Sequence, residues 1–349
     1  MKVTMEVIAR KVGVSRNAVS LALRNHPSIS PGLRARIHAA AERFGYQRNP
    51  AFGELMSQMR RKGHGARQAT LALFNAHPDP AAFRTHPTIP EYVKGCRRRA
   101  DLLGYTLDTF WIHDPGIDSA RWIQILEARG IRGILVIGLM TQNRLPAHLL
   151  ELFGRFPAVV TGVRTREPAL SFACVDHHEL ALQAVEQALS LGYRRPALIL
   201  DPVIDQLVEG RFTAGYMTGQ RALAKTQRLP PFYQVAEARR NPTLFHRWVK
   251  RHQPDVLFTL YNEVRHWVEE GGWQVPLDLG LIQLEWRESQ PDWAGLHQHN
   301  DLVGEAAMDM LVGMLHRGET GPPAAPRATL IAPTWMPGTT IKPQPLPHT

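Results

Sequence analysis

Arg16 and Asn17 stand side by side at the start of a run of good helix formers, and both side chains can recognise bases. A guanidinium can donate two hydrogen bonds to one guanine edge, and a carboxamide can pair in the same bidentate way with adenine. Ser15, directly before them, is a residue type that caps helix N-termini. Gly13 suits a left-handed turn two residues earlier. The segment therefore predicts a turn and a capped helix with two base-contacting side chains in its first turn.

Three short helices are expected around this segment. The first follows a cap at Thr4 and runs to about residue 11, and the second spans roughly residues 16–24. The third begins after Ser30 with proline at its first position and ends at Gly45. Apolar residues recur at helical spacing in all three, which gives each helix an inward face. This is the pattern of a helix-turn-helix domain, whose second helix enters the major groove while Ser15 and Ser20 contact phosphates.

Positive charge is concentrated in the same region. Residues 1–62 contain twelve Lys and Arg and three acidic residues, so they carry +9 of the formal net charge of +10. A basic module joined to a near-neutral body is typical of nucleic-acid binding. The competing interpretation is a solvated basic face on which Arg16 and Asn17 have no partner. The helical apolar spacing argues against a simple basic tail.

These residues resemble the DNA-binding headpiece of the lac repressor (LacI/GalR) family of bacterial transcription regulators. The matching motifs are "VSRNAVS" (14–20) with Asn25, and "AAERFGYQRN" (40–49). The resemblance implies that Arg16, Asn17 and Leu21 hold the specificity positions, and Leu21 can offer only apolar contact, for instance to a thymine methyl. The DNA-binding residues expected in this way are Thr4, Ser15, Arg16, Asn17, Ser20, Leu21, Asn25, Asn49 and Leu55.

The family also has a hinge helix that orders on DNA and inserts a leucine into the minor groove. Residues 49–62 occupy this place, with Asn49 as a cap and Leu55 as the expected wedge. The chain departs from the family by having Phe52-Gly53 where Ala-Arg is usual. Gly53 lowers helix propensity by about 1 kcal/mol relative to alanine.

Beyond a linker at 63–68, apolar strand-like runs alternate with amphipathic helical stretches. This alternation predicts an α/β fold of parallel sheets covered by helices, arranged as two similar lobes. The family resemblance implies a periplasmic-binding-protein-like domain for effector binding and dimerisation over 69–345, after a headpiece over 1–48. The expected first lobe is about 69–163 with 296–322, and the expected second lobe is about 164–292 with 325–345.

Ligands of such sheets bind beyond the carboxyl ends of the strands. The resemblance places the effector contacts there, at Asn75, His77, Thr88, Ile89, Arg211, Asn262 and Glu285. Two alternatives stay open. Arg211 lies four residues before Gly215, where the family usually has three, so it could be a surface residue. Asn262 could cap the following helix, and Asp176 is expected to cap rather than to bind ligand.

Other classes of function find little support in the sequence. The chain lacks the HExxH, P-loop, GxGxxG and Gly-x-Ser-x-Gly motifs, so no enzyme class is indicated and no cofactor or metal is expected. The clusters at 177–179 and 297–299 are attributed to chance among sixteen histidines. Two cysteines exclude a disulfide framework, and no signal peptide or membrane span is found. A cytoplasmic protein is expected.

The sequence thus predicts a homodimeric repressor that binds a near-palindromic double-stranded operator and responds to a small, sugar-like effector. A dimer rather than a tetramer is expected, because the chain stops without a C-terminal heptad segment. One alternative is a cytoplasmic sugar-binding or sugar-processing protein with an incidental basic segment. A second is a regulator of the same fold that answers to a protein partner. The sequence identifies neither the operator nor the effector.

Overall fold

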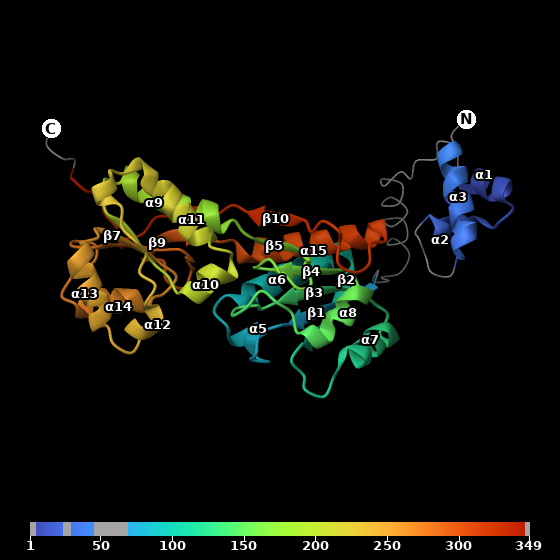
Figure 1. Cartoon of the computed structure of the whole chain (residues 1–349), viewed down its shortest axis with the longest axis horizontal. Helices are drawn as coiled ribbons and strands as arrows, with labels where there is room; N and C mark the ends of the chain where they lie inside the picture. The colour runs from blue at the N-terminus through green and yellow to red at the C-terminus, as the bar shows by residue number, and fades with distance from the viewer. Residues whose placement is uncertain (1–4, 24–28, 45–68, 346–349) are drawn as a thin grey trace.

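The computed structural model describes residues 5–23, 29–44 and 69–345. Three helices, α1 (Met5–Val12), α2 (Arg16–Ala22) and α3 (Pro31–Arg43), form a unit at the N-terminal end of the chain (Figure 1). Ile8, Val19 and Ile37, one from each helix, are fully buried at its centre. The three predicted helices are confirmed, with small differences at their ends. Thr4, Asn25, Asn49 and Leu55 lie outside the described residues, as do the hinge segment and the linker.

The turn between α1 and α2 follows the sequence pattern. Gly13 has a φ of +77°, and its N–H donates to the carbonyl of Ala9 at 2.9 Å. Ser15 then caps α2, because its Oγ accepts a hydrogen bond of 3.1 Å from the N–H of Ala18. From α3, the Arg36 guanidinium donates to the carbonyl of Val12 at the end of α1. This contact satisfies a backbone group that a helix end leaves unpaired.

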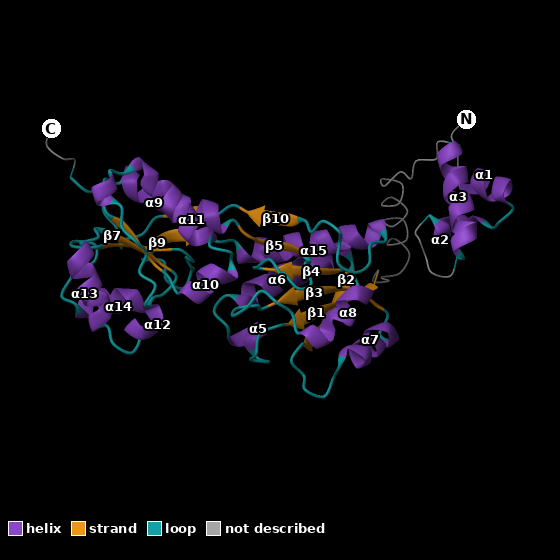
Figure 2. Cartoon of the chain, in the orientation of Figure 1, coloured by secondary structure: helices purple, strands orange, loops and turns teal. Residues whose placement is uncertain are grey.

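The first sheet of the body has six parallel strands in the order β10-β5-β4-β3-β1-β2. The strands are β1 (Ala69–Asn75), β2 (Tyr105–Trp111), β3 (Ile131–Ile137), β4 (Ala158–Thr161), β5 (Ser171–Val175) and β10 (Ala328–Ile331). The helices of this lobe are α5 (Ala82–Thr85), α6 (Ile89–Leu103), α7 (Ser119–Ala128), α8 (Leu150–Arg155) and α15 (Asn300–Arg317). The long helices α6 and α15 pack on one face, while α7 and α8 cover the other (Figure 2).

The second sheet has the order β11-β9-β8-β7-β6, with only β11 antiparallel. Its strands are β6 (Pro196–Ile199), β7 (Val256–Thr259), β8 (Gly280–Gln283), β9 (Ala294–His297) and β11 (Thr334–Met336). The helices are α9 (His177–Ser190), α10 (Pro202–Leu207), α11 (Arg211–Gly219), α12 (Val235–Ala238), α13 (Thr243–His252) and α14 (Glu263–Glu270). Apolar side chains of α9 and α11 cover one face, and those of α13 and α14 cover the other.

Sheet membership corrects the expected lobe boundaries. Strands β5 and β10 belong to the first sheet, although residues 164–292 and 325–345 were assigned to the second lobe. Residues 296 and 297 belong to β9 in the second sheet, although they were assigned to the first lobe. The first lobe is therefore residues 69–175 with 300–331, and the second is 177–297 with 334–345. Apolar patterning identifies a parallel strand but not the sheet in which it pairs, which explains the error.

The two lobes are joined by three short crossings, at residue 176, at 298–299 and at 332–333. His299 takes a φ of +52° at the second crossing. Within the described residues, no helix is long and apolar enough to cross a membrane.

Helices α6 and α15 approach each other so closely that glycine is required between them. A Cβ added at Gly95 would lie 1.8 Å from the carbonyl oxygen of Asp301, which is backbone and cannot move aside. Ion pairs flank this contact, with Arg98 and Asp301 at 2.8 Å and Arg99 and Asp309 at 2.7 Å. The packing fixes α15, and with it the crossing that precedes it, against the first sheet.

We expect Gly95→Ala to lower the free energy of unfolding by about 2 kcal/mol or more, because the added methyl forces two helix backbones apart. Gly154→Ala is the matched control, since nothing lies within 4 Å of a Cβ at that helical position. The control should leave stability unchanged or raise it by up to about 1 kcal/mol, as alanine favours helices. Urea denaturation measures both, and equal effects of the two substitutions would contradict the close approach.

Candidate functional site

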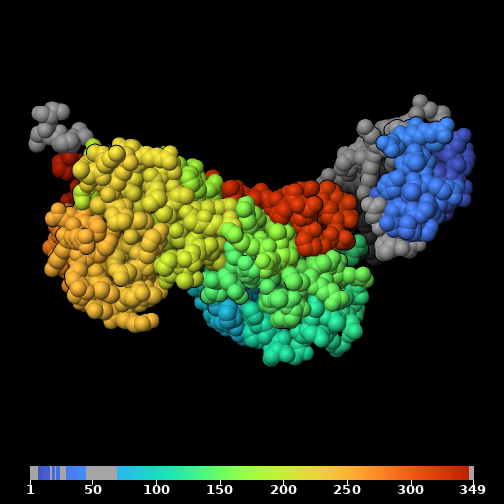
Figure 3. All heavy atoms as spheres, in the orientation of Figure 1, coloured from blue at the N-terminus to red at the C-terminus, as the bar shows by residue number. Residues whose placement is uncertain are grey.

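The two lobes meet along a groove, visible in Figure 3 between the second lobe in yellow and orange and the first in green and blue. Loops that follow strand ends contact each other across it. Arg287, which follows β8, donates to the Oγ1 of Thr88 before α6 at 3.3 Å. Glu209 of the second lobe pairs with Arg164, which follows β4, at 3.3 Å. The carboxyl ends of both sheets therefore face one cleft, the usual place for a ligand in such folds.

One group of polar side chains surrounds Glu285. We call it the Glu285 cluster, and its members are Asn262, Gln283, Glu285, Arg287 and Asn300. The Glu285 carboxylate pairs with Arg287 at 2.8 Å and accepts a hydrogen bond of 3.3 Å from Asn300 Nδ2. Gln283 Nε2 donates to Asn262 Oδ1 at 2.8 Å.

Two acceptors of the Glu285 cluster have no hydrogen-bond partner. They are Gln283 Oε1 and Asn300 Oδ1, both buried. A buried acceptor without a partner costs free energy, so such groups in native proteins usually meet water or a ligand. Hydroxyl groups can donate to both oxygens and accept from the neighbouring guanidinium and amides. The cluster is thus suited to a polyhydroxylated ligand.

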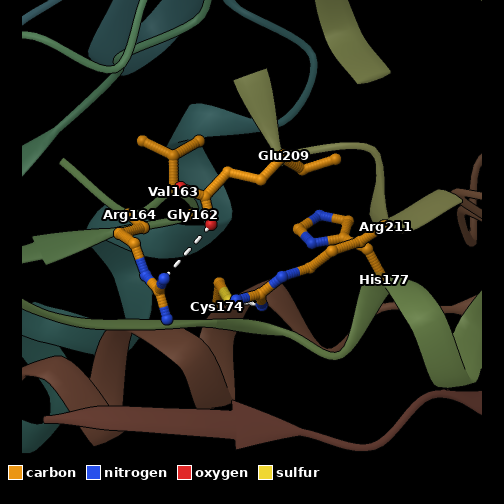
Figure 4. Close-up of a pocket in the computed structure, with 8 residues that line it drawn as sticks. Gly162, Val163, Arg164, Cys174, His177, Glu209 and Arg211 are labelled. Atoms are coloured by element: carbon orange, nitrogen blue, oxygen red, sulfur yellow. Dashed lines mark hydrogen bonds and ion pairs between the residues drawn. The ribbon is translucent and has the colours of Figure 1, made fainter. Parts of the chain in front are cut away.

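A second group lines a pocket between the lobes, which we call the arginine pocket (Figure 4). Its empty space is about 190 Å³ with open solvent included, and its lining residues are Gly162, Val163, Arg164, Cys174, His177, Val208, Glu209 and Arg211. The guanidinium of Arg211 lies 3.9 Å from the sulfur of Cys174 and 5.9 Å from the ring centre of Phe172. Glu209 also pairs with Arg166 at 3.0 Å.

Burial sets the protonation of the arginine pocket. Burial, with a further contribution from Arg211, lowers the pKa of His177 to about 3, so its imidazole is neutral at physiological pH. Burial raises the pKa of Cys174 to about 12, which keeps the thiol protonated. A protonated thiol is a poor nucleophile. The Nδ1 atom of His177 is buried and has no hydrogen-bond partner.

Tyr92 lies between the Glu285 cluster and the arginine pocket. A Cβ at Gly162 would be 3.3 Å from the phenol oxygen of Tyr92, which places that oxygen at the edge of the pocket. Burial raises the pKa of Tyr92, and the charge of Glu285 and the thiol of Cys174 raise it further. The phenol therefore remains a hydrogen-bond donor. Tyr92 thus borders the arginine pocket and lies within range of the charge of Glu285.

Of the seven expected effector residues, Thr88 and Glu285 are linked through Arg287, Asn262 contacts Gln283, and Arg211 lies apart from them in the arginine pocket. Asn262 stands at the N-cap position of α14, but its side chain makes no capping bond and faces Gln283 instead. Arg211 lines the pocket rather than the outer surface.

The other three expected residues have different surroundings. Asn75 is buried, and its amide donates to the carbonyls of Asp79 and Pro80 and accepts from the N–H of His77. The amide therefore shapes the loop in which His77 lies. Ile89 is fully buried in the core of the first lobe. Its side chain contributes packing there and is not accessible to a ligand, so the expected effector contact at Ile89 is corrected.

Several residues of the cleft were missed by sequence reasoning. Gln283 could have been found, because a polar residue at the carboxyl end of an apolar strand needs a partner. His177 was attributed to chance clustering, and Asp176 caps α9 as expected through a bond from the Glu179 N–H. Arg164 and Glu209 gave no signal, because their pairing joins loops that are distant in sequence.

The histidine clusters do not form a metal site in the described part of the chain, where no group of three or more His, Cys, Asp or Glu side chains converges. His297 and His299 instead share a hydrogen bond, with their Nδ1 atoms 3.0 Å apart. His299 Nε2 also lies 2.7 Å from Thr334 Oγ1. These contacts join two of the crossings between the lobes.

In the N-terminal unit, Ser15 is exposed at the start of α2, where it caps the helix. Leu21 is half-buried and packs against the core of the unit. The side chains of Arg16, Asn17 and Ser20 lie outside the described atoms, although the backbone of α2 carries all three in one helix.

Comparisons with known proteins agree with this architecture. Residues 4–49 match the family of bacterial regulatory proteins of the lacI type, and residues 185–341 match the periplasmic binding protein-like domain. The HTH-type transcriptional regulator CelR of Thermobifida fusca is 25% identical over 201 residues. That alignment covers 57% of this chain, and the chain spans only 56% of the length of this relative.

Solved structures show the same fold over nearly the whole chain. The transcriptional regulator CelR in its cellobiose complex superposes with a TM-score of 0.57 at 19% identity, covering 97% of this chain and 99% of that one. The lac repressor dimer bound to operator and the anti-inducer ONPF gives a TM-score of 0.56 at 17% identity, with the same coverage.

The neutral, buried imidazole of His177 predicts a pH dependence of stability. Below pH 6.5 the unfolded chain protonates this histidine while the folded chain does not, so stability falls as pH decreases from 6.5 towards 3. Over this range, the free energy of unfolding of the wild type should fall by about 1.4 kcal/mol per pH unit relative to that of His177→Gln.

Urea denaturation between pH 6.5 and 4 measures this difference. His178→Gln, on the same turn of α9, is the control and should run parallel to the wild type. Parallel curves for wild type and His177→Gln would contradict the buried neutral state.

Proposed function

Because this chain belongs to the lacI family of bacterial regulatory proteins, we propose that it is a sequence-specific DNA-binding transcription regulator controlled by a small sugar-like effector. The observation that carries the proposal is the helix-turn-helix unit of α1 and α2, with a Ser15-capped second helix inside a segment of net charge +9. This charge attracts the phosphate backbone, and the first turn of α2 offers side chains to base edges.

We further propose that the protein acts as a cytoplasmic homodimer on a near-palindromic operator. Two headpieces related by a two-fold axis would contact two half-sites about one helical turn apart. The similar lac repressor structure is a dimer bound to operator. Leu55 of each hinge segment would enter the minor groove, as in the family pattern, and bend the duplex at a cost offset by further contacts.

The cleft between the lobes is the proposed effector site. The unpaired acceptors of Gln283 and Asn300 and the carboxylate of Glu285 provide hydrogen bonds for sugar hydroxyls. A similar regulator has been solved as a complex with cellobiose, which supports a carbohydrate in this cleft. The ligand would bridge the lobes and change the angle between them, and it would shift DNA binding only through different affinities for the two arrangements.

Catalysis is not part of the proposed function. The cleft contains a protonated thiol and a neutral imidazole that are not hydrogen-bonded to each other. Such an arrangement gives no activated nucleophile.

Substitutions in α2 test the DNA-binding role. After the bound sites have been selected from genomic fragments, Arg16→Ala and Asn17→Ala should each weaken operator binding by about 10- to 100-fold. Binding to non-operator DNA should change much less. Arg43→Ala removes the same charge from α3. It should lower the affinity for operator and non-operator DNA by the same factor. Fluorescence anisotropy at fixed salt measures all three variants. Equal losses on operator and non-operator DNA for Arg16→Ala would contradict base recognition by α2.

Ligand binding in the cleft has its own test. We expect at least one member of a panel of mono- and disaccharides, sugar acids and sugar phosphates to raise the Tm of the full chain. The stabilisation is about 2.7 kcal/mol at 100 times Kd. Glu285→Gln and Asn262→Ala should each lower the affinity for this ligand by about tenfold, because each loses hydrogen bonds to it. A chain lacking residues 1–62 should still bind it but lose specific DNA binding. If no panel member shifts Tm while operator binding is intact, regulation by a protein partner is favoured.

A further inference from the structure

We propose that the effector carries an anionic group, a carboxylate or a phosphate, which binds in the arginine pocket through Arg211 and Arg164. The inference rests on the proposed function, because it names the chemical class of the ligand for the same cleft. It is carried by four observations on the pocket.

The first observation is that no carboxylate of the described residues pairs with Arg211. Arg211 is half-buried, and its guanidinium lies near the Cys174 sulfur and the Phe172 ring. Neither contact neutralises the positive charge of Arg211 or uses the two parallel N–H donors of its guanidinium. A partly buried cation without a counter-ion is costly, and a carboxylate or phosphate can accept two parallel hydrogen bonds from a guanidinium.

The second observation is that two guanidiniums share one aromatic ring. Arg164 lies 5.4 Å from the centre of the Phe172 ring, and Arg211 lies 5.9 Å from the same centre. Both therefore converge on one side of the pocket, as Figure 4 shows for their side chains around Cys174. Both charges act on the Cys174 thiol, and Arg164 already pairs with Glu209, so an anion that enters here would supply the missing partner of Arg211 beside a second guanidinium.

The third observation is the unpartnered nitrogen of His177. The residue is 7% exposed, lines the pocket, and leaves its Nδ1 without a hydrogen-bond partner. A neutral imidazole can donate from one nitrogen and accept at the other. It therefore suits a ligand that carries a hydroxyl next to its anionic group.

The fourth observation is that two helices begin at the pocket. His177 is the first residue of α9, and Arg211 is the first residue of α11. Helix N-termini carry partial positive charge and favour anions. Asp176 and Asp205 each accept a hydrogen bond from one N–H of these first turns. The two helix N-termini therefore contribute positive potential to the pocket rather than a full set of N–H donors.

The carboxylates around the pocket have other partners. Arg164, Arg166 and Arg211 lie here with Glu209, Asp176 and Asp205. Asp176 caps α9 and Asp205 accepts hydrogen bonds from Thr213, so neither pairs with Arg211. Glu209 is shared between Arg164 and Arg166 and is therefore not available to Arg211. A ligand with its anionic end at Arg211 can place a neighbouring hydroxyl at the unpartnered Nδ1 of His177. A sugar acid and a sugar phosphate both have this chemistry.

The test uses the full chain and matched ligands. Glucose, galactose and mannose are compared with their uronic acids, their aldonic acids and their 6-phosphates by Tm shift and by titration calorimetry. At least one acid or phosphate should bind at least about tenfold more tightly than its neutral parent, as expected for a charge-assisted pair. Comparison of the sugar acids with the sugar phosphates shows which of the two anions the pocket binds.

Variants assign the anion contact to Arg211. Arg211→Gln should lower the affinity for the anionic ligand by about tenfold or more. The variant should then bind the anionic ligand no more tightly than its neutral parent sugar. Arg211→Lys keeps the positive charge but loses the two parallel N–H donors of the guanidinium. Its affinity for the anionic ligand should lie between those of the wild type and Arg211→Gln. Arg221→Gln removes an exposed arginine of the same lobe and should leave the affinity unchanged. The Tm of each free variant shows that it is folded.

Three results would overturn the inference. They are a neutral sugar that binds as tightly as its acid and phosphate, an Arg211→Gln variant that behaves like Arg221→Gln, or a panel in which no anionic ligand binds. In each case, intact operator binding by the same preparation would leave the proposed DNA-binding function standing. Loss of specific DNA binding would instead count against the proposed function itself.

Discussion

The path of the chain between the two sheets is the constraint on which the rest of the structure depends. Strand β10 pairs with β5, and β11 pairs with β9, so each lobe is completed by a segment that returns from the other. The lobes are consequently held by three short crossings rather than by one flexible linker. The close packing of α6 on α15 ties one crossing rigidly to the first sheet. Such an arrangement permits opening and closing of the cleft while preserving the order of the strands that line it.

This constraint explains how a small ligand could influence a distant headpiece. Contacts across the cleft come from loops of both lobes, as in the bond from Arg287 to Thr88 and the pairing of Glu209 with Arg164. In the proposed function, a ligand that satisfies the unpaired acceptors of the Glu285 cluster would favour one lobe angle over another. In the proposed function, the orientation of the first lobe, which follows the headpiece in the chain, would set where the headpieces can reach. Coupling of this kind requires a difference in affinity between the two arrangements and nothing more.

Much of the fold could be predicted from the sequence, because its signals are local. Gly13, Ser15 and the proline after Ser30 mark turns and helix starts that the structure confirms. Apolar runs marked most strands of both sheets. Lobe boundaries could not be found in this way, since β5 is equally apolar in either lobe and only its pairing with β4 and β10 decides. The same limit applies to the cleft. Arg211 and Glu285 follow predicted strands, whereas Arg164 and Glu209 meet only when the lobes come together.

The central claim is that the first turn of α2 contacts base edges in the major groove. Replacing single guanines of the selected operator by 7-deazaguanine tests it most directly, because this base lacks the N7 acceptor that an arginine needs. The account predicts one position in each half-site where the replacement weakens the wild type but causes no further loss in Arg16→Ala. If the two losses add at every position, Arg16 does not contact a guanine N7, and the proposed mode of recognition is wrong.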